Sequence, residues 1–112
     1  MKVHTALGPG LLESAYEACL ACELTQAGIK VARQKRRPIT YGELKPDEGY
    51  RIDLVVEERV VVELKAIEQL REIHEAPLLS YLRLSRMEVG LLINFHVSHL
   101  REGIRRVINT KK

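Results

Sequence analysis

The sequence contains no long hydrophobic run. No stretch of its 112 residues approaches the roughly 20 apolar residues of a membrane-spanning helix, and the first residues lack the apolar segment of a secretory signal. Internal repeats and low-complexity segments are also absent. With 46% hydrophobic and 29% charged residues, the chain has the balance of a folded protein. We therefore expect a cytoplasmic protein without membrane contacts, folded as one domain over residues 1–112.

Cysteine is scarce, and its spacing does not indicate a metal site. Cys19 and Cys22 form a CxxC pair, but the sequence has no second pair and no nearby histidine at zinc spacing. Both fall inside a helical pattern, where free cysteine usually behaves as a small hydrophobe. We expect both thiols to be buried.

Positive charge is only slightly in excess. A net charge of +3 and a pI near 9.0 permit phosphate binding without requiring it. Basic residues gather around two short predicted strands, 29–34 and 38–42. Such a run either keeps a sheet edge solvated or contacts the phosphates of a nucleic acid, and both interpretations stay open. Its members are Lys30, Arg33, Lys35, Arg36 and Arg37.

The stretch 50–65 is typical of a β-hairpin. Val, Ile and Leu dominate both halves, and three charged residues separate them. In the second strand the period of two places Glu63 and Lys65 on one face, roughly 7 Å apart. In the first strand, Asp53 lies between two apolar residues, where an acid needs a reason. These charges are the candidates for chemistry.

The register of this hairpin decides whether the two acids meet. Asp53 shares a face with Glu63 if Val56 pairs with Val60, which leaves a three-residue turn. A two-residue turn would set Asp53 against Val62 and separate the carboxylates. The site hypothesis therefore depends on the longer turn.

The segments around the hairpin favour an α/β fold. A helix is expected from the Gly-Pro-Gly turn at 8–10 to about Gln26, ended by Gly28, with Glu13 and Tyr16 facing the same way. There Glu13 is either an acid favoured by the helix dipole or a functional group. The apolar stripe of this helix is predicted to contain Leu12, Ala15, Cys19 and Cys22.

A second helix is expected at 75–86, with Pro77 in its first turn and His74 as a surface or capping residue. Tyr81 either directs its hydroxyl toward the hairpin or fills core space. The apolar run 89–95 predicts a strand parallel to the second hairpin strand, joined to it by a right-handed crossover. Ser98 is expected to cap a last helix that ends near Ile108. The predicted order is helix, four strands, helix, strand, helix around a mixed central sheet.

The charged residues suit a hard cation and phosphodiester hydrolysis. Asp53 and Glu63 offer oxygen ligands for Mg²⁺ or Mn²⁺, with a backbone carbonyl nearby, and Glu13 can hold a second ion or position the first. Lys65 can orient the attacking water or stabilise charge on the phosphate. Tyr16 and Tyr81 are expected to support these groups. The alternative is a set of ordinary surface ion pairs.

The whole pattern resembles a known family. The stretch 10–16, GLLESAY, followed by Asp53 and by Glu63-Leu64-Lys65, is similar to the GxxExxY protein family within the PD-(D/E)XK nuclease superfamily, and HEAPLLSYL and GLLINFHV extend the resemblance over nearly the whole chain. It implies a restriction-endonuclease-like core, a metal-dependent nuclease and a nucleic-acid partner, DNA in the first place. The catalytic set it implies is Glu13, Asp53, Glu63 and Lys65.

One position departs from that pattern. The family carries Gln where Pro77 stands, four residues before Tyr81, and proline cannot supply that amide. Two hypotheses follow. The first is a Mg²⁺-dependent nuclease, for which the fold makes a homodimer plausible. The second is a catalytically weak or inactive module that binds nucleic acid or protein and keeps the fold.

Overall fold

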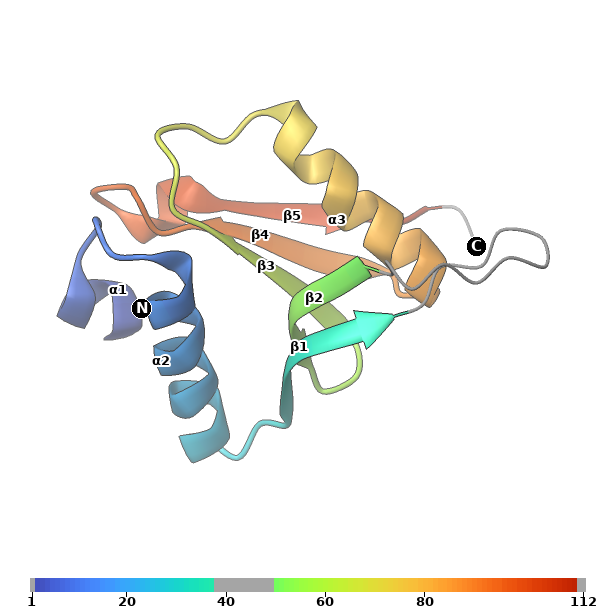
Figure 1. The fold of residues 1–112 in the computed structure, drawn as a ribbon, viewed down its shortest axis with the longest axis horizontal. Coiled ribbons are helices and arrows are strands. Elements are labelled where there is room, and N and C mark those ends of the chain that lie inside the picture. The colour runs from blue at the N-terminus through green and yellow to red at the C-terminus, as the bar shows by residue number, and fades with distance from the viewer. Residues whose placement is uncertain (1, 38–49, 111–112) are drawn as a thin grey trace.

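A five-stranded sheet forms the centre of the computed structural model, which describes residues 2–37 and 50–110 (Figure 1). The sheet is mixed, because β3 and β4 are parallel and every other pair of neighbours is antiparallel. This is the α/β class with a mixed central sheet that we expected. In spatial order the strands are β1 (Val31–Arg37), β2 (Tyr50–Val56), β3 (Val60–Lys65), β4 (Val89–Asn94) and β5 (Ile104–Ile108).

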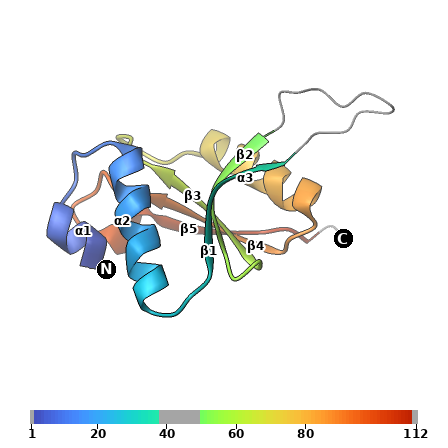
Figure 2. The same cartoon turned by 60° about the horizontal axis from the view of Figure 1, so that its bottom comes forward.

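Helices cover both faces of the sheet (Figures 1 and 2). One face packs against α1 (Lys2–Leu7) and α2 (Glu13–Gln26), and the other packs against α3 (Glu72–Ser85). The alternation of β3 fits this arrangement, since Val62 joins the core cluster of α2 while Val61 joins that of α3. Among the described residues, no helix has the length and apolar character needed to cross a membrane.

The central hairpin is present, with the register that the site hypothesis requires. Val56 pairs with Val60, so the turn contains three residues, and Arg59 donates its backbone N–H to the Val56 carbonyl at 3.0 Å. Glu57 and Glu58 adopt left-handed backbone angles, with φ of 53° and 57°. This conformation matches the twist of the strands, although glycine and asparagine adopt it more easily than glutamate.

The parallel pairing of β3 with β4 was predicted correctly, and in the structure Glu63 lies opposite Leu92. The predicted start of α3 was wrong. This helix begins at Glu72, so Pro77 lies in its second turn, where proline has no N–H to donate. His74 permits the earlier start, because its Nδ1 accepts the backbone N–H of Arg71 at 2.8 Å. The expected capping role of His74 is confirmed.

The predicted last helix is wrong. After β4 the chain forms a short 3-10 turn, Leu100–Gly103, and then β5, which pairs with β4. The apolar residues of this segment fit a helical period, but they also fit a strand that satisfies the free edge of β4. Gly103 contributes to this choice, because its backbone packs so closely against the Asn94 carbonyl that a side chain would clash.

The predicted apolar stripe of α2 is wrong as well. Leu12 is 77% exposed, and Cys19 and Cys22 are exposed free thiols rather than core residues. The larger side chains of Tyr16 and Leu20 face the sheet instead. They bury more apolar surface than alanine and cysteine would, which explains the rotation of the helix.

The basic run does not divide two strands. Lys35, Arg36 and Arg37 lie inside β1, which continues to Arg37 and forms one edge of the described sheet. The second predicted strand, at 38–42, lies outside the described residues.

Candidate active site

The strands β2 and β3 separate at Asp53 and Glu63. Their pairing runs from Val56↔Val60 to Leu54↔Val62 and, within the described residues, ends there, although both strands continue. The next step in the same register would set Asp53 against Glu63. Both acids therefore lie where the two strands diverge, and we call this position the fork.

Backbone hydrogen bonds cross the fork in both directions. Asp53 Oδ2 accepts the N–H of Leu64 at 2.9 Å, and Glu63 Oε1 accepts the N–H of Asp53 at 3.4 Å. Each carboxylate thus reaches the backbone of the opposite strand. The fork brings the two acids together, as the hypothesis of a shared site requires.

Burial changes the acidity of both groups. Burial, reinforced by the negative charge of Asp53, raises the pKa of Glu63 to about 7. Burial also raises the pKa of Asp53, against the opposing effect of the hydrogen bond from Leu64. Two carboxylates in this position repel each other when both are ionised, and a cation between them would relieve the repulsion.

Glu13 and Lys65 complete the predicted set. Glu13, the first residue of α2, accepts the backbone N–H of Ala66 through Oε2 at 3.3 Å, just beyond the end of β3. Beside burial, the charge of Glu13 raises the pKa of both Asp53 and Glu63, while Lys65 lowers it. The charges of Glu13 and Lys65 therefore both reach the two acids of the fork.

The donors present decide which metal would fit. In residues 2–37 and 50–110, no three His, Cys, Asp or Glu side chains form a ready metal-binding group. Mg²⁺ keeps several waters and is often bound through one or two carboxylates. Asp53 and Glu63 therefore fit a hydrated Mg²⁺ or Mn²⁺.

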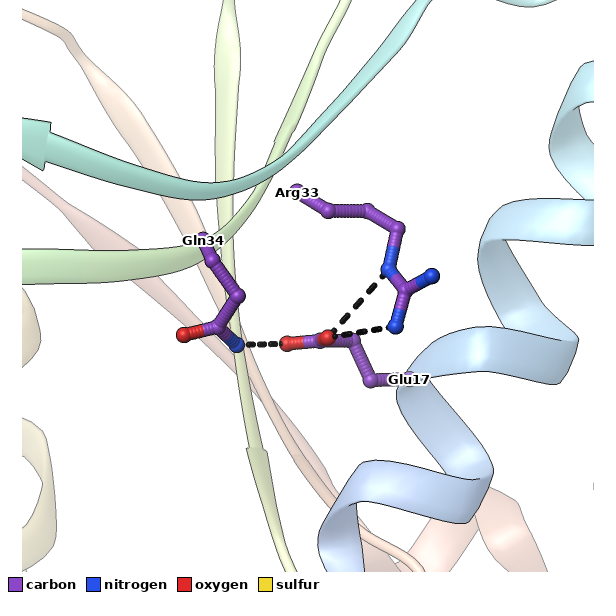
Figure 3. Close-up of polar contacts among 3 residues, drawn as sticks. All are labelled: Glu17, Arg33 and Gln34. Carbon is purple, nitrogen blue, oxygen red and sulfur yellow. Dashed lines mark hydrogen bonds and ion pairs between the residues drawn. The ribbon is translucent and has the colours of Figure 1, made fainter.

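Glu17 is a site residue that sequence reasoning missed. Although it is charged, it is only 5% exposed. Its carboxylate accepts hydrogen bonds from Arg33, at 3.0 Å from Nη2 and 3.3 Å from Nε, and from the side-chain amide of Gln34 (Figure 3). After burial, the charge of Glu17 is a further cause of the raised pKa of Asp53. The available signal was its position one helical turn after Glu13.

The two tyrosines pack on opposite faces of the sheet. The Tyr16 hydroxyl accepts the N–H of Leu11 at 3.0 Å and donates to the Gly8 carbonyl, while its ring stacks on Phe95 at 4.3 Å. Tyr16 thus fixes the turn that precedes α2 and Glu13. Tyr81 is half-buried and packs against the core cluster of α3.

Two of the predicted basic residues are held by acids of this chain. Arg33 pairs with Glu17, as described, and Lys35 Nζ lies 3.4 Å from Glu58. Lys35 is mostly buried at its side chain, whereas Glu58 is largely exposed. These two cations are partly neutralised within the protein.

Two of the other basic residues, Lys30 and Arg36, are exposed. Of Arg37 the structure gives the backbone position alone, as the last residue of β1. Arg36 lies directly opposite Arg51 on β2, which is exposed too, and neither forms a salt bridge within the part of the chain that the structure describes. Like charges directly opposite in a sheet repel each other. This pair therefore favours an anionic ligand.

Comparison with known proteins gives one match. Residues 1–107 match the family model described as the PD-(D/E)XK nuclease superfamily. No curated protein and no solved structure matches the chain. The matched stretch contains Glu13 and the three charged residues of the fork region.

Proposed function

We propose that this chain, which belongs to the PD-(D/E)XK nuclease superfamily, is a divalent-metal-dependent nuclease that hydrolyses nucleic-acid phosphodiester bonds. Two hydrogen bonds across the fork carry this proposal, one from the Asp53 N–H to Glu63 Oε1 and one from the Leu64 N–H to Asp53 Oδ2. They bring two acids of raised pKa together at the end of β3, beside a lysine. A resemblance to the GxxExxY family supports the same conclusion.

Asp53 and Glu63 would hold Mg²⁺ or Mn²⁺. When bound, the ion supplies an acidified water and neutralises charge on the phosphate. The pKa of Glu63, about 7 because of burial and of Asp53, means that this group must give up its proton before it binds a cation. Glu63 is therefore the residue through which the proposed site senses pH.

Lys65 and Glu13 have complementary roles in this proposal. Strand alternation puts Lys65 on the face of Glu63, where its ammonium would orient the attacking water or stabilise negative charge on the phosphate. Glu13 would hold a second ion or position the first through water. Tyr16 supports Glu13 by fixing the turn before α2, and we assign Tyr81 a similar supporting role on the side of α3.

The proposed nucleic-acid contact follows β1. Arg36 is its centre, because it faces Arg51 across the strands next to Asp53 and has no salt bridge among the described residues. DNA is the first substrate to test. The proposed contact residues are Lys30, Arg33, Lys35, Arg36 and Arg37, to which the structure adds Arg51.

A second candidate function is a catalytically weak binding module. Pro77 favours it, since proline stands in α3 where the resemblance implies glutamine.

We also propose a homodimer, supported by Ile104 and Ile108 on the edge strand β5, which are 41% and 50% exposed. Analytical ultracentrifugation tests this state, and a monomer at all concentrations would contradict it.

The deciding experiment combines metal binding with cleavage. Calorimetry with Mg²⁺ and Mn²⁺ compares the wild type with Asp53→Asn, which keeps an oxygen that can accept the Leu64 N–H. A panel of DNA and RNA substrates is then cleaved by the wild type and by Lys65→Ala. We expect the wild type to bind metal and to cleave nucleic acid. Asp53→Asn should not bind metal, and Lys65→Ala should not cleave. Metal binding without cleavage would support the binding module, and equal cleavage by Lys65→Ala would identify a contaminating nuclease.

A further inference from the structure

The pairing of β1 with β2 is interrupted at one position. Residues pair from Val31↔Val56 to Arg33↔Leu54 and again from Lys35↔Ile52 onward, but Gln34 and Asp53 are skipped. Gln34 has a left-handed backbone, with φ of 51°. For a residue with a side chain this conformation is strained, so other contacts must maintain it.

At the interruption, the side chains of β2 also change the face of the sheet on which they lie. Residues two apart in a regular strand share a face, yet Ile52 packs in the core cluster of α3 and Leu54 in that of α2. The strand therefore reverses its faces at Asp53. Figure 2 shows the matching bend in β1. At this reversal the N–H of Asp53 is directed to Glu63 and its carboxylate to Leu64, rather than to β1.

The side chain of Glu17 maintains the interruption from the helix side. Its buried carboxylate receives Gln34 on one oxygen and Arg33 on the other, so it binds the skipped residue and the residue before it (Figure 3). Hydrogen bonds to a charged group are the stronger kind. No other salt bridge among the described residues joins α2 to the sheet.

We propose that Glu17 is a positioning residue, which holds Arg33 and Gln34 so that β1 stays unpaired opposite Asp53 and the Asp53 carboxylate remains directed into the fork. The inference rests on the proposed function, because it assigns the geometry of the proposed metal ligand to a residue outside the ligand set. Glu17 acts through Gln34 and Asp53 and does not itself contact metal or substrate.

The test uses Glu17→Ala alone and combined with Gln34→Gly. Without its acceptor, Gln34 should relax toward regular pairing, and the N–H of Leu64 should lose protection in amide hydrogen exchange. Mn²⁺ affinity and kcat should fall by about 10- to 100-fold, the usual effect of removing a group that orients a metal ligand. KM for the nucleic acid should not rise. Glycine adopts the left-handed conformation freely, so Gln34→Gly should restore most of the loss.

Glu75→Ala is the matched control. It removes another ion pair between a helix and a strand, Glu75 with Arg105 at 2.8 Å, and should leave Mn²⁺ affinity unchanged. Should Glu17→Ala fail to fold, Gln34→Thr takes its place, since Gln34 is exposed and a β-branched residue resists left-handed angles. Normal Leu64 protection in the variant, or a loss of affinity matched by Glu75→Ala, would overturn the proposal. If the wild type binds no metal, the proposed function fails while the exchange measurement still decides the role of Glu17.

Discussion

Asp53 and Glu63 are linked through the backbone at the fork: the N–H of Asp53 donates to Glu63 Oε1 at 3.4 Å, and the N–H of Leu64 donates to Asp53 Oδ2 at 2.9 Å. In a regular sheet these two backbone N–H groups would donate to carbonyls of the neighbouring strand. Here they donate to the two carboxylates instead. The site therefore lies at the point where β2 and β3 stop pairing. The chemistry of the fork follows from this arrangement, and it leads to measurable consequences.

Stability in the absence of metal should fall as the pH rises. The folded-state pKa of Glu63 is raised by burial and by Asp53 from 4.5 to about 7, so between these values the folded protein binds more protons than the unfolded chain. The free energy of unfolding should decrease through this window by at most about 3 kcal/mol and then level off. Asp53 contributes in the same direction, because burial raises its pKa too.

Urea unfolding in a chelating buffer at several pH values between 4.5 and 8 measures this effect. Glu63→Gln is the control, since it cannot ionise and should flatten the slope. A wild-type stability that increases with pH through this window would show that Glu63 is not destabilised by its charge.

A divalent cation should reverse that loss. Mn²⁺ binds the ionised form, so it should raise the Tm of the wild type at pH 7.5, by an amount that grows with metal concentration. Asp53→Asn should remove the shift while keeping a neutral acceptor for the N–H of Leu64. An equal rise in Tm in this variant would place the cation elsewhere on the protein.

The sequence permitted a correct prediction of the central hairpin because its information is local. Charged residues separate two apolar runs, which predicts the hairpin, while the sequence left open two turn lengths, of which the structure has the three-residue turn. Strand β4 was equally clear from its apolar run, and its parallel partner followed from the intervening helix. These features can be predicted from the pattern of residues within each segment and from the order of the segments.

The errors concern features that depend on distant contacts. The segment from Ser98 to Ile108 has apolar residues that fit both periods, and only the open edge of β4 makes it a strand. The rotation of α2 depends on the space beside the sheet, which Tyr16 and Leu20 fill better than the cysteines do. Gln34 gave no local signal either, because its positive φ goes with a hydrogen bond to Glu17, 17 positions earlier in the chain.

The hairpin turn should tolerate, and benefit from, glycine. Glu58 has a φ of 57° and is exposed, and because its carboxylate is solvated, its ion pair with Lys35 at 3.4 Å adds little stability. Glu58→Gly should therefore raise the free energy of unfolding by about 1 kcal/mol, measured with urea, because glycine adopts this conformation without strain. Cleavage activity should not change. A loss of stability would mean that the ion pair outweighs the backbone strain.

The salt dependence of DNA binding should identify the contact pair. Each phosphate contact contributes about 0.9 to the slope of log K against log salt, so Arg36→Gln with Arg51→Gln should reduce the slope by about 1.8. Arg59→Gln, at the exposed tip of the hairpin, is the control and should leave the slope unchanged. Equal slopes for the wild type and the double variant would remove Arg36 and Arg51 from the proposed contact.

Substitution of Pro77 separates helix stability from chemistry. Pro77 is the sixth residue of α3 and is exposed, so its missing N–H leaves the carbonyl of Ile73 without the usual helical donor. Pro77→Ala and Pro77→Gln both restore that donor and should each stabilise the protein by about 2–3 kcal/mol. Only glutamine also supplies the amide that the family resemblance implies, four residues before Tyr81.

If that amide takes part in catalysis or substrate binding, Pro77→Gln should increase kcat/KM while Pro77→Ala leaves it at the wild-type value. Cleavage assays at one metal concentration, run beside unfolding curves for both variants, measure the two effects independently. Equal activity of the two variants would show that the side chain at this position has no part in the reaction. The low activity expected of a degenerate nuclease would then need a cause at the fork itself, where Asp53, Glu63 and Lys65 are all retained.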